Sequence, residues 1–251
     1  SAVEESRRIV VGSSSLTPEQ QLGRRLFFSA SDPRMTTGTS AGIACASCHP
    51  GGREDGRTWM FSEGPRNTPT LAGRRLATTA PYHWDGLLDD MHAFRMVVEE
   101  RMGGAGTRGN PFAPTGEVPA LTEADFNAML AYLESLPAPE NPFRGEALPE
   151  AAMRGKEIFE GRAACASCHA GDDLTDNNFY DVGTIREIDR FPKLVNTPTL
   201  RNIFYSAPYL HDGSIATLRE RVLVNPGDKH GITSDLTPAE VDDLVEYLKT
   251  L

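Results

Sequence analysis

The sequence has few cysteines, fewer basic than acidic side chains and no long apolar run. Each of these features argues against a particular class of protein. No stretch approaches the ~18 consecutive apolar residues that a membrane span requires, so no membrane span is expected. Lys and Arg number 25 against 35 Asp and Glu, for a net charge of −10. No basic cluster is long enough to hold a phosphate backbone, so nucleic acid is not an expected partner.

What is present is the composition of an ordinary globular chain. Of the 251 residues, 39% are hydrophobic and 24% are charged, which excludes disorder and collagen-like fibres. At ~150 residues per domain, this length fits one large domain or two small ones. The 23 glycines and 18 prolines predict many turns between helices. The chain opens at Ser1 without an initiator Met or an apolar signal core, as expected of a processed or trimmed chain.

All four cysteines lie in two identical pentapeptides, Cys-Ala-Ser-Cys-His, at residues 45–49 and 165–169. Alone, Cys-x-x-Cys fits a dithiol redox pair or half of a zinc site. The His that follows favours attachment of c-type haem instead. Thiols three positions apart on a helical turn share a face and can bond one porphyrin, while the next residue reaches the iron as its proximal ligand. The sequence therefore predicts two covalent haems c, bound by Cys45, Cys48, His49, Cys165, Cys168 and His169.

Three more segments recur in the same order in the two halves of the chain. Residues 67–71, 80–86 and 121–124 are matched by residues 196–200, 207–213 and 236–239. Between the halves, residues 137–142 include three prolines and cannot continue a helix. We therefore predict two tandem class I cytochrome c-like domains related by internal duplication, residues 1–137 and 146–251, joined by a linker at 138–145.

Helix signals dominate both halves. Residues 17–20 and 237–240 read as capping boxes with Pro at the first helical position. After the second box, one apolar stripe at helical spacing comprises Val241, Leu244, Val245, Leu248 and Leu251. No segment sustains the alternation of a strand, so the expected fold class is mainly α. A unit of ~110 residues is small, and a covalently held haem is expected to supply much of its apolar core.

Together, these segments resemble the bacterial di-haem cytochrome c peroxidases and their MauG-type relatives. The likeness covers nearly the whole chain. It rests on paired Cys-x-x-Cys-His motifs, each followed by Asn-Thr-Pro-x-Leu, and then by Trp-Asp-Gly in the first half and His-Asp-Gly in the second. The chain is short for this family, so some of the family's loops are expected to be missing.

The resemblance implies two roles for residues outside the haem motifs. Trp84, in Trp-Asp-Gly, matches a tryptophan that relays electrons between the two haems; the alternative is a Trp that only fills the interface between domains. Asn67 and the backbone carbonyls of Ser206 and Pro208 match a calcium site between the domains, where Ser replaces the usual Thr. The alternative there is a capped turn without an ion.

The sixth iron ligands depart from the family pattern. In the second half, the family's Met or Tyr position, fourteen residues beyond His211, is Asn225, which is not a credible haem ligand. His211 matches a position that does not normally bind the iron. His230 follows in a turn, Asn-Pro-Gly-Asp-Lys-His-Gly, that is rigid enough to present its ring. We expect His230 to be the distal ligand of the second haem, against the alternative of a solvated loop histidine.

The first haem offers less guidance. In the repeat, Trp84 matches His211, and His230 lies nineteen positions after His211. The position nineteen residues after Trp84 is Gly103, which is next to Met102, so Met102 is the expected distal ligand. The alternatives are His83, His92, an iron left open, and a purely structural Met102 on one helical face with Met91, Phe94 and Val98.

These features favour electron transfer through two haems, because axial ligands of different kinds give a pair of irons with different potentials. The alternative is a hydrogen-peroxide reductase or MauG-like oxidase, which needs an open iron and a distal acid or base. By resemblance, the family's distal Gln position is Phe94, and the acids nearest to its distal Glu are Glu99 and Glu100. The expected partners are a small cytochrome c or cupredoxin, or hydrogen peroxide. Since haem c is attached after export, a bacterial periplasmic location is expected.

Overall fold

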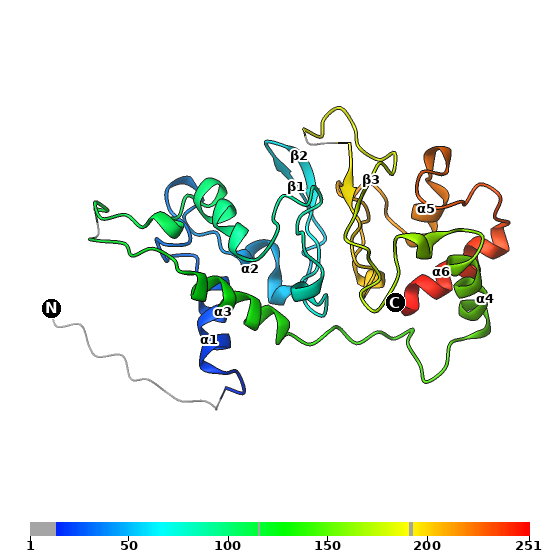
Figure 1. Ribbon diagram of the computed structural model, residues 1–251, viewed down its shortest axis with the longest axis horizontal. Coiled ribbons are helices and arrows are strands. Elements are labelled where there is room, and N and C mark those ends of the chain that lie inside the picture. Colours follow the sequence, from blue (N-terminus) through cyan, green and yellow to red (C-terminus); the bar gives the residue numbers. More distant parts are fainter. Residues whose placement is uncertain (1–13, 115, 191–192) are drawn as a thin grey trace.

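A computed structural model describes residues 14–114, 116–190 and 193–251. The molecule is elongated, with a pair of packed helices toward each end and loops with two short hairpins between them (Figure 1). In the first half, α1 (Pro18–Phe27) packs on α3 (Glu123–Glu134); in the second, α4 (Glu150–Glu160) packs on α6 (Pro238–Thr250). The shorter α2 (Cys45–Cys48) and α5 (Leu218–Leu223) lie nearer the middle of each half.

Side-chain caps start three of the four long helices. Thr17 and Thr237 form the predicted capping boxes with Gln20 and Glu240, and Pro occupies the first turn of α1 and α6. Thr122 caps α3 in the same way, with Asp125 as its reciprocal partner. Each cap satisfies backbone N–H groups that a helix start leaves unpaired, so these positions fix where the helices begin.

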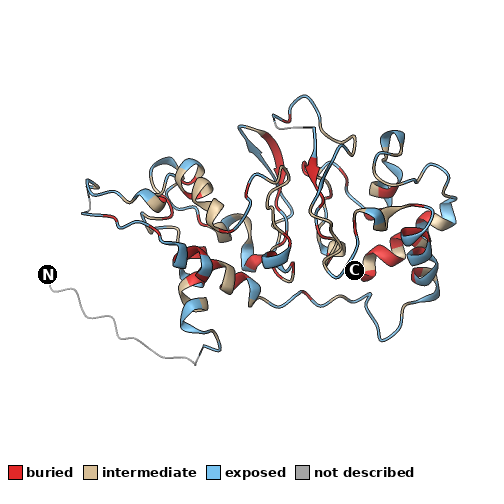
Figure 2. Cartoon of the chain, in the orientation of Figure 1, coloured by how far each residue is buried: buried red, intermediate tan, exposed pale blue. Residues whose placement is uncertain are grey.

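Within each helix pair, the two helices cross at a glycine. A Cβ added at Gly23 of α1 would lie 1.8 Å from the carbonyl oxygen of Ala128, and one added at Gly155 of α4 would lie 2.0 Å from that of Asp243. Only a residue without a side chain lets the backbones approach this closely. The buried residues concentrate at these crossings (Figure 2), around Phe27 and Phe126 in the first half. The core of the second half includes Phe159, Val241, Leu244 and Tyr247.

Two antiparallel hairpins lie in the middle of the molecule (Figure 1). β1 (Thr58–Phe61) pairs with β2 (Gly64–Asn67), and β3 (Phe179–Tyr180) pairs with β4 (Val195–Asn196). Strands of two to four residues are too short to show a sequence alternation, so they were not predicted. Short 3₁₀ turns cover Gly38–Ser40, Pro50–Gly52, Leu76–Thr78, His92–Phe94, Gly106–Arg108, Cys165–Ser167, Ile203–Tyr205 and Pro226–Asp228.

The predominance of helices over strands agrees with the mainly α class. One expected element is wrong in detail. The segment that was to carry Met91, Phe94, Val98 and Met102 on one face is not a continuous α-helix but a 3₁₀ turn, His92–Phe94, followed by a π-helical turn, Val97–Arg101. Because π turns advance the chain by a different angle, a helical-face argument does not place Met102. The domain boundaries and the internal duplication stay predictions.

The chain crosses between the halves below the hairpins in Figure 1. There the side-chain amide of Asn141 donates to the carbonyl of Lys249 (2.9 Å), and Arg144 Nε donates to that of Thr250 (3.0 Å), so the proline-rich segment is tied to the end of α6. None of the helices in the described ranges is long and apolar enough to cross a membrane.

Candidate haem sites and the contact between them

The first Cys-x-x-Cys-His motif forms a helical turn. Cys45 and Cys48 open and close α2, and His49 follows at its C-terminal cap. Burial lowers the pKa of His49 to about 4, while the nearby carbonyl of Pro69 opposes the shift. Its Nδ1 is buried with no hydrogen-bond partner among the described residues. A neutral buried imidazole beside two thiols of one turn is the donor set that a covalent haem needs.

The second motif is built alike. Cys165 begins the 3₁₀ turn Cys165–Ser167, and Cys168 and His169 follow it. The His169 ring is buried, and its Nδ1 lies 3.1 Å from the carbonyl oxygen of Leu174. Burial also lowers its pKa, and the carbonyls of Leu174 and Pro198 oppose the shift.

Pro69 and Pro198 are contributions that the sequence analysis missed. Both belong to the recurring Asn-Thr-Pro segments, and each places a carbonyl near the proximal histidine of its own half. These carbonyls favour the protonated form of the rings, whereas the partner of His169 Nδ1 at hydrogen-bond distance is the carbonyl of Leu174. The recurrence of these segments was the signal that could have identified them.

The four thiols are not arranged as a zinc site. Within the described ranges, no three His, Cys, Asp or Glu side chains converge as metal ligands. The haem interpretation of the motifs therefore fits the structure better than a zinc interpretation.

His169 faces a second imidazole. The rings of His169 and His230 lie 5.9 Å apart between centroids and are perpendicular (89°). Two imidazoles on opposite sides of one metal ion, each bonded at about 2 Å, have centroids roughly 6 Å apart. Burial lowers the pKa of His230 to about 3, with Arg221 and His169 adding to the shift, so the ring is neutral as a ligand must be. The two histidines therefore fit an iron held between them.

Asn225, not itself a ligand type, organises the turn that presents His230. Its side-chain oxygen accepts the backbone N–H of His230 (2.9 Å). Its amide nitrogen donates to the carbonyl of Gly231 (2.8 Å) and to the hydroxyl of Thr233 (2.9 Å). Arg221 donates to His230 Nδ1 from the other side. The sequence analysis rejected Asn225 as a ligand and did not foresee this role.

The first half presents no equally clear partner for His49. Met102 is buried, and its backbone carbonyl accepts from Thr37 (3.0 Å). His83 lies close enough to His49 for their charges to interact, and its ring packs on Phe94 (5.7 Å between centroids). Burial lowers the pKa of His83 to about 4. The ring of His92 packs instead on the core residue Phe126, 5.3 Å between centroids.

The two candidate distal acids differ in their surroundings. Glu99 is held by the backbone and hydroxyl of Thr107 (2.8 and 2.7 Å), and by Arg108 (2.8 Å). Burial raises the pKa of Glu99, but these donors more than offset it, so the pKa ends below its ordinary value. Glu100 is exposed. A carboxylate held ionised is a poor proton donor, so the catalytic role of both residues stays a prediction.

The two halves meet through reciprocal contacts. The backbone N–H of Asn67 donates to the carbonyl of His211 (2.6 Å), and that of Asn196 donates to the carbonyl of Trp84 (3.0 Å). Each Asn-Thr-Pro segment thus binds the Trp-Asp-Gly or His-Asp-Gly turn of the other half. The Trp84 indole N–H also donates to the carbonyl of Asn67 (3.1 Å), and its ring meets the His211 ring edge-on, 6.4 Å between centroids.

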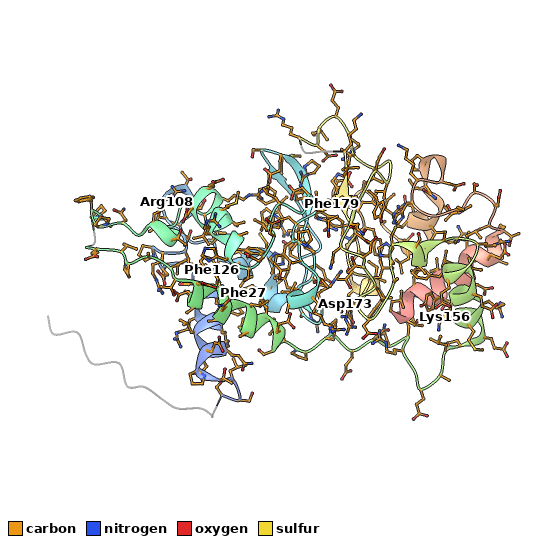
Figure 3. The ribbon with its side chains drawn as sticks, in the orientation of Figure 1. Phe27, Arg108, Phe126, Lys156, Asp173 and Phe179 are labelled. Carbon is orange, nitrogen blue, oxygen red and sulfur yellow. The ribbon has the colours of Figure 1, made fainter. Side chains whose placement is uncertain are left out.

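Glycines in these turns admit side chains from the opposite half. A Cβ on Gly86 would lie 2.3 Å from the ring of Phe179, and one on Gly213 would lie 2.3 Å from the hydroxyl of Thr58. Asp173, labelled with Phe179 in Figure 3, forms an ion pair with Arg75 (2.9 Å) across the same region. The predicted relay Trp84 therefore sits within a packed contact between the halves.

The predicted calcium ligands are brought together in part. The side-chain amide of Asn67 contacts the carbonyl of Pro208 and lies 3.4 Å from that of Leu210. The Ser206 hydroxyl accepts from Arg74 Nη2 (2.9 Å), whose guanidinium is buried and also contacts the carbonyl of Thr199. Carbonyl oxygens suit calcium. The Asn67 contact is made by its amide nitrogen and the Ser206 contact by its hydroxyl rather than its backbone carbonyl, so the calcium site stays a prediction.

The fold and the two motifs define a c-type cytochrome. The family model for cytochrome c matches residues 21–137 and 152–251, which together form most of the chain. The methylamine utilization protein MauG of Methylorubrum extorquens is 33% identical, over 94% of this chain and 79% of that protein. The cytochrome c551 peroxidase of Pseudomonas aeruginosa is 26% identical, over 93% and 78%. A chain of hydrazine synthase from Kuenenia stuttgartiensis superposes with a TM-score of 0.72, at 25% identity and full coverage of both chains.

The chain therefore belongs to the bacterial di-haem cytochrome c peroxidase and MauG-like family. Haem c is its cofactor type, and the helical arrangement is that of cytochrome c domains.

Proposed function

We propose that this protein is an electron-transfer cytochrome that carries two covalent haems c, one in each half. The observation that carries the proposal is the 5.9 Å spacing of the neutral rings of His169 and His230, which suits an iron closed on both sides. Bound haem supplies a one-electron redox couple. An iron held by both rings would exchange electrons but leave no position for peroxide at that haem, so the distal side of the first haem decides between electron transfer and peroxide reduction.

In the first half, His49 is the proposed proximal ligand and Met102 the proposed distal one, with His83 as its rival. A thioether and an imidazole tune iron differently, so the two haems would differ in potential. Trp84, in contact with both halves, is the proposed relay between them. Asn67, Ser206 and Pro208 are the proposed calcium ligands, and the two halves, 1–137 and 146–251, are the proposed domains.

The proposed partners are small redox proteins, a cytochrome c or a cupredoxin, met in the bacterial periplasm. The relatives named as cytochrome c551 peroxidase and MauG make peroxide chemistry the obvious competing function. The ionised, fully engaged Glu99 and the apolar Phe94 at the family's Gln position do not favour it.

Stopped-flow mixing of the purified two-haem protein with a reduced small cytochrome c tests the proposal. We expect both haems to accept electrons and hydrogen peroxide to remain unconsumed in the presence of excess reduced donor. Sustained peroxide turnover, coupled to oxidation of the donor, would contradict the electron-transfer assignment and favour the peroxidase.

A further inference from the structure

Asp189 is a buried carboxylate to which neither the motifs nor the proposed function gives a role. Its side chain is fully buried. Oδ2 accepts from the backbone N–H of Arg186 (2.9 Å) and lies 3.0 Å from His211 Nε2, and Oδ1 lies 3.3 Å from Arg66 Nη1. Burial raises the pKa of Asp189, but these donors more than offset it, so the carboxylate is ionised.

The carboxylate fixes the ring of His211. That ring is 1% exposed, and because an ionised carboxylate only accepts, the hydrogen bond places a proton on Nε2. The His211 ring contacts the ring of Trp84 edge-on. The indole N–H of Trp84 in turn donates to the carbonyl of Asn67 (3.1 Å), which holds the indole in place. Asp189, His211 and the half-buried Trp84 therefore form one row of contacts that crosses from the second half to the first.

Arg66 anchors this row to the first half. Its guanidinium donates to the carbonyls of Pro65 (2.7 Å) and Glu63 (2.8 Å), in and beside the β1–β2 hairpin, as well as to Asp189. The neighbouring Arg186 pairs with Asp212 (2.6 Å). The charge of Asp189 is thus directed at Arg66, in the β1–β2 hairpin of the first half, and at His211 of the second half, which contacts Trp84.

We propose that Asp189 is the positioning residue of the path between the haems: it holds His211 against Trp84 and so fixes the relay in its transfer geometry. This inference rests on the proposed function, because it assumes that electrons pass between two haems by way of Trp84. Asp189 touches neither haem motif in the contacts described above and acts through His211.

The test measures electron exchange between the haems of the holoprotein after one-electron photoreduction, followed by transient absorbance. Asp189→Asn keeps the size of the side chain and removes its charge. We expect exchange to slow by about tenfold or more, because small misplacements of a reacting group have large kinetic effects. Asp189→Glu, which restores the carboxylate, should recover most of the rate. Asp242→Asn is the matched control, since Asp242 pairs with Arg219 on the exposed surface (2.8 Å).

A double variant separates positioning from general loosening. In a Trp84→Phe background, where exchange is already slow, Asp189→Asn should add little further slowing. Equal slowing with and without Trp84, or no slowing by Asp189→Asn, would overturn the inference. If Trp84→Phe exchanges as fast as the wild type, the relay itself fails instead.

Should Asp189→Asn mature with fewer than two haems, Arg66→Lys serves in its place. It keeps both charges and weakens the contact, so about threefold slowing is expected. An unchanged rate in that variant would overturn the inference as well.

Discussion

The two halves of the molecule hold their proximal histidines alike but differ in what stands opposite them. His169 faces the His230 ring at 5.9 Å, whereas His49 lies near His83, and Met102, the neighbour of the residue at the matching count, is buried on a different turn. The Cys-x-x-Cys-His motif and a nearby Asn-Thr-Pro carbonyl are thus common to both. The distal side is set by loops, and identical motifs do not make identical iron sites.

The loops differ for identifiable reasons. In the second half, Asn225 bonds the backbone of His230 and Gly231 and the hydroxyl of Thr233, which closes a compact turn around the ligand. In the first half, the corresponding stretch is a π-helical turn that ends against Thr37. A π turn often marks a functional position, but it presents no imidazole here.

The largest expected effect comes from removing the second imidazole. His230→Ala should open the second iron completely, so that the reduced protein binds carbon monoxide at that haem, which the wild type does not. Lys229→Ala is the control, because Lys229 neighbours His230 and pairs with Asp181 at the surface (2.5 Å). Equal carbon monoxide binding by wild type and variant would remove the distinction between the halves.

The first half is tested by a pair of variants. Met102→Leu should abolish the near-infrared charge-transfer band that an iron–thioether bond gives, and it should leave the second haem unchanged. His83→Phe keeps the thioether and should retain the band. The opposite pattern, with the distal ligand lost in His83→Phe alone, would assign the first iron to two histidines and make the halves alike.

A smaller effect is expected from the turn that presents His230. Asn225→Ala removes four hydrogen bonds from a partly buried site, a loss of about 1–3 kcal/mol in holding the turn. We expect added imidazole to displace His230 at lower concentration than in the wild type. Asn178→Ala, whose side chain bonds only Asp176 at the surface, is the control. Unchanged displacement would mean that the iron holds the turn without help from Asn225.

The smallest expected effect is that of low pH on the stability of the folded protein. Because the folded pKa of His230 is lowered from 6.5 to about 3, the unfolded chain takes up a proton that the folded ring refuses, so stability falls as pH drops from about 6.5 toward 3 and is flat above this range. The absorbance of the second haem should therefore keep its neutral-pH form down to about pH 4. A ligand change centred near pH 6.5 would show that the ring titrates as if exposed.

The sequence was sufficient for features with local signatures and insufficient for those built by distant contacts. The capping boxes at Thr17 and Thr237 and the turns at both cysteine motifs are confirmed, because each depends on neighbours within four residues. The prediction that Met91 and Met102 share one face of an α-helix was wrong, because the π-helical turn Val97–Arg101 interrupts the 3.6-residue repeat of the α-helix. No sequence pattern indicated a role for Asp189, because its partners His211 and Arg66 lie 22 and 123 positions away in the chain.

Electron paramagnetic resonance of the fully oxidised holoprotein tests most directly whether the second iron is held between two histidines. We predict a low-spin ferric signal of two-imidazole type, assigned to the second haem by its loss in His230→Ala. A spectrum in which that haem is high-spin, or a two-imidazole low-spin signal that persists in His230→Ala, would contradict the account.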